Sequence, residues 1–304
     1  MHEISSPTRV RPRTGLNKEF VWKHRWIPKA VAASSWLCFL AVLFLRNSEA
    51  LILLSAGVAL FCSYALGYSE RAFQQTFSPA LTHLKRRQYA EVWDALAETR
   101  ELASLAACGV RAETELRSSV QNCLRNLLEL TRISKSDEVL EIGCGVGRVG
   151  SELAIRCKRW TGCDVSTKML SYAQERLKVI RNIRLVPLCG RGLSEFKAGT
   201  FDVVFATNML GHLDEIDRWR YVEEAFRVLR PGGRLSIDNI DLESDAGWRM
   251  FANDAKNFGE TDRPPYMPRF STAAEFCSYA SRAGFKEIAV HRRAPLVVVI
   301  AEKP

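Results

Sequence analysis

Residues 137–304 alternate between short apolar runs and longer segments with helical spacing. The short runs "EVLEIG", "WTGCDV", "RLVPLC", "FDVVFATN" and "RLSIDNI" are rich in β-branched and aliphatic residues and predict strands. Between them, apolar residues recur every three or four positions, as at Met169, Ala173 and Leu177. This alternation predicts an α/β fold with a mainly parallel sheet and helices on both faces.

Two further strands are predicted at the end of the chain. "EIAVHR" and "LVVVIAEK" follow a predicted helix over "TAAEFCSYASRAGF", and only a short turn separates them. Parallel neighbours need a crossover of a dozen or more residues. One of the last two strands is therefore expected to run antiparallel to the others.

The first 70 residues have a different pattern. Residues 30–45 and 50–68 are two uncharged apolar runs joined by "RNSE". At ~1.5 Å per residue, the second run matches the hydrocarbon thickness of a bilayer and the first falls slightly short. Two such runs in tandem predict a transmembrane helical hairpin over residues 29–70. A cleaved signal peptide is disfavoured, because the preceding basic segment is too long and a second apolar run follows.

The net charge of +9 is concentrated at the N-terminus. The first 29 residues contain seven Lys or Arg and two acids. Basic residues on both sides of the hairpin place both termini in the cytosol by the positive-inside rule. We therefore expect residues 1–28 to be a basic cytosolic arm and the α/β domain to lie in the cytosol beside the membrane. The arm's position next to the hairpin favours anionic lipid over nucleic acid as its partner.

Residues 71–116 are predicted to be a helical linker or cap, and residues 117–304 the α/β domain. "YAEVWDALAETRELASLAACG" ends in a glycine suited to a helix C-terminus. In the next segment, Val120, Leu124 and Leu127 share one helical face and are expected in the core. The nine cysteines form no C-x-x-C pair and no Cys/His cluster with zinc spacing, so no metal site is expected.

The turn after the first predicted strand carries the clearest chemical signal. In "VLEIGCGVGRVG", three glycines occur at Gly143, Gly145 and Gly147, and a G-x-G-x-x-G begins at the second of them. Asp164 follows at the end of the second strand, about 20 residues on, where a carboxylate accepts hydrogen bonds from a ribose. These features suit both a nicotinamide dinucleotide and S-adenosylmethionine.

Glu141 distinguishes the two ligands. Its carboxylate precedes the first glycine by two residues, where it would repel a pyrophosphate. S-adenosylmethionine carries a positive sulfur and an α-ammonium, which a nearby carboxylate favours. The combination E-x-G-x-G-x-G therefore predicts S-adenosylmethionine as the cofactor and disfavours a nucleotide-dependent oxidoreductase.

At four motifs the chain resembles the class I S-adenosylmethionine-dependent methyltransferases. They are "VLEIGCGVGRVG", "GCDVSTKML", "FDVVFATNMLGHLD" and "FRVLRPGGRL". The resemblance covers about residues 117–304 and is strongest to the type 11 branch, which includes quinone and small-molecule methyltransferases. It implies a Rossmann-like seven-stranded sheet of order 3-2-1-4-5-7-6, with strand seven antiparallel.

The resemblance also implies which residues contact the cofactor. Those expected at its methionine part, ribose, adenine or reacting centre are Glu141, Gly143, Cys144, Gly145, Gly147, Asp164, Val165, Met169, Asn208, Met209 and Leu210. After the third strand the family usually places an acid or amide near the adenine, and this chain has "LCGRG" instead. Backbone carbonyls at Cys189 and Gly190 are expected to replace it, with Glu195 as an alternative. This departure keeps open a non-catalytic S-adenosylmethionine-binding module.

The methyl acceptor is less clearly indicated by the sequence. His212 is the candidate catalytic base if the acceptor is a hydroxyl or acidic carbon, and the alternative is that it packs against the following helix. Asp214 is expected to cap that helix. Asp238 and Asn239, at the end of the fifth strand, face the region where ligands bind such sheets.

The segment over residues 241–270 is long and rich in aromatic residues, so it is a candidate lid, and a small separate core explains the aromatic residues equally well. Together with the predicted hairpin, it suggests a small, hydrophobic acceptor such as a quinone, an isoprenoid or a lipid-like molecule, methylated on oxygen or carbon.

Overall fold

The computed structural model describes residues 84–109, 113–190, 192–259 and 263–304, and of residues 113–119 and 122 the backbone only. The predicted basic arm and membrane hairpin lie outside these residues. In the described ranges, no helix combines the length and apolar character needed to cross a bilayer. The chain divides into two compact units, Met1–Thr76 and Phe77–Pro304.

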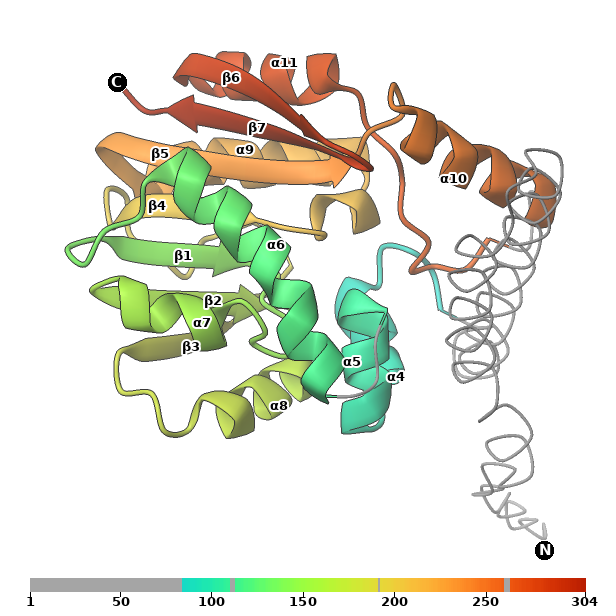
Figure 1. The fold of residues 1–304 in the computed structure, drawn as a ribbon, viewed down its shortest axis with the longest axis horizontal. Helices are drawn as coiled ribbons and strands as arrows, with labels where there is room; N and C mark the ends of the chain where they lie inside the picture. Colours follow the sequence, from blue (N-terminus) through green and yellow to red (C-terminus); the bar gives the residue numbers. More distant parts are fainter. Residues whose placement is uncertain (1–83, 110–112, 191, 260–262) are drawn as a thin grey trace, which may run out of the picture. The chain divides into compact units, whose positions relative to one another are not determined.

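The second unit is built on one seven-stranded sheet with the order β3-β2-β1-β4-β5-β7-β6 (Figure 1). β7 pairs antiparallel with both β5 and β6, and the other pairs are parallel. The predicted sheet order and the reversed last strand are thus confirmed. The strands are β1 (Glu138–Ile142), β2 (Arg159–Asp164), β3 (Ile183–Pro187), β4 (Phe201–Ala206), β5 (Leu229–Ile240), β6 (Lys286–Arg293) and β7 (Leu296–Glu302).

Helices cover both faces of this sheet, as predicted. They are α4 (Tyr89–Leu96), α5 (Arg100–Cys108), α6 (Glu113–Thr131), α7 (Gly150–Leu153), α8 (Thr167–Leu177), α9 (Glu215–Val228), α10 (Asp245–Asn257) and α11 (Ala273–Ala283), with 3₁₀ turns η1 (Ala154–Arg156) and η2 (Leu210–His212). The helix α7 is short, because the chain tightens into η1 directly after it. The expected lid contains α10, so much of it is regular structure.

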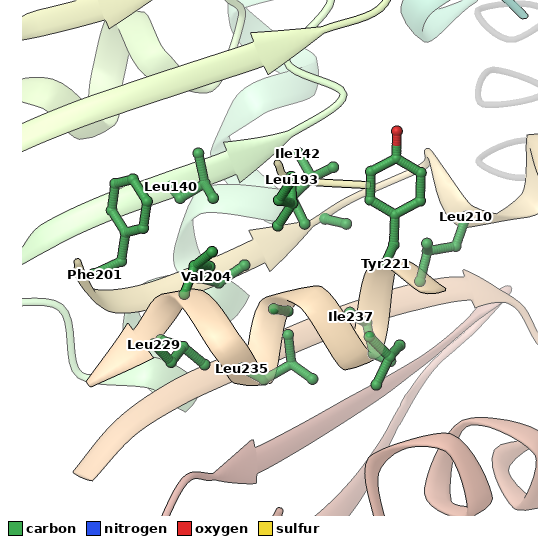
Figure 2. Close-up of a cluster of buried hydrophobic side chains, with 14 of the residues drawn as sticks. Leu140, Ile142, Leu193, Phe201, Val204, Leu210, Tyr221, Leu229, Leu235 and Ile237 are labelled. Atoms are coloured by element: carbon green, nitrogen blue, oxygen red, sulfur yellow. The ribbon is translucent and has the colours of Figure 1, made fainter. Parts of the chain in front are cut away.

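The two faces of the sheet hold two separate cores, because successive side chains of a strand point to opposite faces. Val139 packs with α6, α7 and α8, while Leu140 packs with α9 and α11. Figure 2 shows the second core, where side chains of β1, β4 and β5 meet α9. The predicted stripe on α6 is buried in the first core at Val120, Leu124 and Leu127.

The ends of the helices follow local sequence rules. Ser166 and Thr272 cap α8 and α11 with their side-chain oxygens, and Gly284 ends α11 in the left-handed conformation. Asp214 occupies the N-cap position of α9. Among the described residues, however, its carboxylate contacts Arg87 (3.0 Å) and Arg269 (2.9 Å) and not the first turn of that helix. The expectation of a side-chain cap was wrong, because nearby guanidinium groups compete for this carboxylate.

Candidate functional site

A pocket with an empty volume of about 850 Å³ lies at the C-terminal ends of β1, β2 and β4. Parallel strands bring their carboxyl ends to one edge of the sheet, which is where ligands bind in this fold class. Ten predicted site residues line this pocket, namely Glu141, Gly143, Cys144, Gly145, Asp164, Val165, Met169, Asn208, Met209 and His212.

The glycine turn lets backbone form one wall of the pocket. Gly143 and Gly145 have φ angles of 71° and 53°, a region that side-chain-bearing residues rarely adopt. A Cβ atom on Gly143 would lie 2.3 Å from Cγ of Met209. Glycine is therefore required at this position both by conformation and by the close approach of the loop after β4.

Glu141 is a buried carboxyl at the bottom of the pocket. It is 3% exposed, and its Oε2 accepts a hydrogen bond of 3.0 Å from Nε1 of Trp160. Burial raises the pKa of Glu141 to about 8, while the charge of Arg148 acts in the opposite direction. Burial thus favours the neutral form of this carboxyl, and a cationic group bound beside it would favour the ionised form.

Trp160 also explains the last glycine of the G-x-G-x-x-G. A Cβ atom on Gly150 or Gly162 would lie 2.5 Å or 2.3 Å from the indole ring. The fully buried indole therefore fits only between glycines, and it positions the Glu141 side chain. Gly150 is needed for this packing, and a dinucleotide-binding role is not required to explain it.

Asp164 ends β2 and is also buried. Its Oδ2 accepts from the backbone N–H of Gly145 at 2.8 Å, and its Oδ1 from that of Ser166 at 2.9 Å. Burial raises its pKa, and these two bonds oppose the shift. Each carboxylate oxygen has a second lone pair, so the predicted contact with a ribose remains geometrically available.

Four predicted cofactor residues, Gly147, Cys189, Gly190 and Leu210, are not among the described residues that line the pocket. A Cβ on Gly147 would come within 3.1 Å of Ala173, so this glycine allows close packing of the turn against α8. Leu210 is buried in the core. Cys189 is exposed, and its N–H donates to Glu195 at 2.9 Å. Glu195 is thus bonded to the loop itself.

The helical segment predicted as a linker or cap covers the pocket. Tyr89 and Trp93 of α4 and Ala107 of α5 line it, and sequence reasoning had named none of these residues as part of the site. Tyr89 and Trp93 are four residues apart, so their rings lie on one face of the helix. This spacing occurs both in helices that face a ligand and in helices that face a core, so the sequence did not distinguish the two. Tyr221 of α9 and Leu188 after β3 also line the pocket.

Asp94 holds this cap in place. Its Oδ1 accepts from Oγ of Ser166 at 2.6 Å and from the N–H of Lys168 at 3.1 Å. Both groups belong to the first turn of α8, which follows directly after Asp164. The α4 helix is therefore tied to the loop that carries the predicted ribose ligand.

Replacing Asp94 with alanine is expected to weaken binding of S-adenosylhomocysteine by about five- to tenfold, because both bonds to the start of α8 are lost. Isothermal titration of the purified protein measures this effect. Glu91→Ala, an exposed change on the same helix, is the matched control. Equal affinities of the two variants would show that the cap does not depend on Asp94.

His212 is half-buried on the pocket wall, with its ring edge-on to Trp93 at 4.8 Å. Its Nδ1 lies 2.7 Å from the carbonyl oxygen of Tyr266, so Nδ1 carries the proton and donates. Burial lowers the pKa of His212 to about 4. The ring is neutral at pH 7 and a weak base, and its predicted catalytic role stays a prediction.

Asp238 and Asn239 have different surroundings. Asp238 accepts from Oγ1 of Thr207 at 2.6 Å and from the N–H of Asn208 at 2.8 Å, and burial raises its pKa to about 6. Asn239 donates to the carbonyl of Arg269 and to Ser271, which gives it a structural role. Asp238 is not among the described residues that line this pocket, and it acts on the pocket wall through Thr207 and Asn208.

The aromatic residues of the expected lid lie elsewhere. None of the described residues 241–259 and 263–270 is among those that line this pocket. Trp248 is 55% exposed, and Phe251 packs against it and against Phe270. These rings form a cluster of their own on α10, so the expected lid does not close the pocket in this structure.

Comparison with known proteins identifies the domain. The "Methyltransferase domain" family matches residues 139–233. A 27-O-demethylrifamycin SV methyltransferase of Amycolatopsis mediterranei is 34% identical over 41% of this chain and 46% of its own length. A demethylmenaquinone methyltransferase of Tropheryma whipplei is 31% identical over 37% of this chain and 46% of its own. The chain thus matches about half the length of these relatives.

Solved structures agree on the fold. The apo structure of the S-adenosylmethionine-dependent methyltransferase SibL has a TM-score of 0.53 and 21% identity, over 70% of this chain and 62% of its own. Residues 139–233 thus match a methyltransferase domain family, and the solved structure shares the fold of this chain.

Proposed function

We propose that this protein uses S-adenosylmethionine to methylate a small acceptor molecule. The observation that carries the proposal is the pair of buried carboxyl groups, Glu141 and Asp164, at the ends of β1 and β2 beside the glycine turn. One is placed for an α-ammonium and the other for ribose hydroxyls, while Val165 and Met169 offer an apolar surface for the base. The residues present fit this cofactor.

The bound cofactor supplies an electrophilic methyl group on a positive sulfur. The protein's own task is then to hold the acceptor at near-attack distance and exclude competing nucleophiles. Trp93 and Tyr89 cover the pocket from α4, and the wall after β4 is formed by Asn208 and Met209. A proton acceptor is needed only where the acceptor atom carries a hydrogen.

Titration with S-adenosylhomocysteine and NADH tests the proposal. We expect binding of S-adenosylhomocysteine and none of NADH, because a pyrophosphate at the glycine turn would be repelled by Glu141 whenever that carboxyl is ionised. Binding of NADH alone would support an oxidoreductase and contradict the proposal. Binding of S-adenosylhomocysteine without methyl transfer to any membrane or cytosolic extract would favour the alternative, a non-catalytic module, which the atypical loop at Cys189 and Gly190 also favours.

For the acceptor, we propose a molecule with a hydrophobic body, such as a quinone, an isoprenoid or a lipid-like compound, methylated on oxygen or carbon. The support is the predicted membrane hairpin over residues 29–70 and the names of relatives that act on demethylmenaquinone and 27-O-demethylrifamycin SV. A protein anchored at the bilayer meets such acceptors in the phase where they concentrate.

The membrane anchor itself gives a separate prediction. Deleting residues 2–76, the first compact unit, is expected to move the protein from carbonate-washed membranes to the supernatant, because both predicted apolar spans are removed. Fractionation followed by immunoblotting measures this. A full-length protein found in the supernatant after the carbonate wash would contradict the anchor.

A further inference from the structure

A second pocket adjoins the first. Its empty volume is about 1230 Å³. It is formed by α6, the ends of β4 and β5, and the turn between β6 and β7, on the sheet face opposite to α9 and α11.

The two pockets share a wall. Arg148, Thr207 and Asn208 line both of them. Asn208 has a φ angle of 54°, a strained conformation for a residue other than glycine. Asp238, on the wall of the second pocket, holds it there through the bonds to Thr207 and to the Asn208 N–H. The two pockets therefore meet at Thr207 and Asn208, and the bonds to Asp238 hold these two residues in place.

The second pocket combines an apolar wall with cationic groups. Leu127 of α6, Phe205 of β4 and Val298 of β7 are buried and form part of the wall. Arg125 lies on α6 and Arg293 at the start of the β6–β7 turn, and both are exposed to solvent.

The cations outnumber the acids in this pocket. Among the described residues, three arginines, counting Arg148, line it, against one carboxyl, Asp238. Glu129, which is exposed, lies 3.5 Å from Arg293 and neutralises part of its charge. A net excess of guanidinium groups favours a carboxylate or phosphate, which arginine binds in a bidentate manner.

We propose that the second pocket is the acceptor site, and that the acceptor carries an anionic group, bound between Arg125 and Arg293, on an apolar or aromatic body. This rests on the proposed methyltransferase function and adds the charge of the substrate to it. The apolar body lies along Leu127 and Phe205, and the accepting atom reaches the junction at Thr207 and Asn208. The alternative to this proposal is a neutral acceptor that enters the cofactor pocket under α4 or past α10.

Matched probes test the charge requirement. We use 4-hydroxybenzoate against 4-hydroxybenzyl alcohol, and 2-naphthoate against 2-naphthalenemethanol, with full-length protein in detergent saturated with S-adenosylhomocysteine. Saturation-transfer NMR titrations measure the affinities. We expect each carboxylate to bind about tenfold more tightly than its alcohol, and Arg125→Gln and Arg293→Gln each to remove most of this difference. Arg249→Gln, an exposed change on α10, is the control.

Affinity for S-adenosylhomocysteine is measured by isothermal titration of the same proteins before this ligand is added, and it should stay within about twofold of the wild type in all three variants. Carboxylates that bind no better than their alcohols, or a preference that survives both pocket substitutions, would overturn the inference and leave the proposed function standing. A wild-type protein that fails to bind S-adenosylhomocysteine would instead refute the proposed function, and the inference with it.

Discussion

The affinity of this protein for S-adenosylhomocysteine is expected to rise by up to about tenfold per pH unit between pH 6 and pH 8. The cause is Glu141, whose pKa burial raises to about 8. Below that pH the empty site holds a neutral carboxyl. The α-ammonium of the ligand favours the ionised form, so binding expels a proton, and this becomes easier as the pH rises.

Isothermal titration at pH 6, 7 and 8, in two buffers of different ionisation enthalpy, measures both the affinity and the released proton. Glu141→Gln should bind weakly and with a much flatter pH dependence, because no proton is left to expel at this position. Glu138→Gln is the matched control, since Glu138 lies on the same strand but pairs with Lys158 at the surface. A wild-type affinity that does not change with pH would refute this account.

The same carboxyl affects folding in the opposite direction. Its pKa in the folded protein is above the ordinary value of 4.5, so the folded state binds more protons than the unfolded state between these values. The contribution of Glu141 to stability therefore falls as the pH rises through that window toward 8. The site thus retains a carboxyl that is unfavourable for folding in the empty protein and favourable for a cationic ligand.

Replacing Arg218 with methionine is expected to cause a large loss of stability, about 3–5 kcal/mol. This side chain is 1% exposed. Its Nε donates to the carbonyl of Leu210 at 2.8 Å, and its Nη2 to that of Arg269 at 3.1 Å. Its Nη1 donates to Ser271 and Glu275. The substitution would leave two carbonyls and a carboxylate without this partner.

The loss should lower the melting temperature by about 10 °C, measured by calorimetry or by circular dichroism. Arg220→Met is the matched control, because Arg220 lies on the same helix but is exposed and pairs only with Asp217 among the described residues. Since Arg218 joins the loop after β4 to the start of α11, S-adenosylhomocysteine binding should weaken as well. Equal melting temperatures of the two variants would show that these bonds contribute little.

Predictions from the sequence succeeded for features that depend only on residues within one short segment. The alternation of apolar runs specified the strands, and the short turn between the last two required an antiparallel pair. The glycine turn with Glu141 and Asp164 indicated where the pocket lies, because these residues are at the C-terminal ends of two neighbouring strands. In each case the physical requirement is satisfied by residues close together in sequence.

Features that depend on contacts between distant segments could not be predicted in this way. Asp214 has the sequence context of a helix cap, but Arg87, 127 residues away, competes for its carboxylate. The aromatic residues before Phe270 are typical of a lid and pack instead with one another on α10. Trp93 lies in the segment predicted as a linker or cap, and its position over the pocket depends on contacts with distant segments, such as the bonds from Asp94 to the start of α8.

The sequence by itself determined the α/β class, the order of the sheet through its family resemblance, and the cationic character of the ligand expected at Glu141. These follow from periodicity and from charge at one turn. Tertiary structure alone decided that Gly150 serves the Trp160 indole, that the pKa of Glu141 rises, and that a second pocket meets the first at Asn208. The reason is physical, because burial and close approach are set by which distant segments pack together, and no local pattern encodes them.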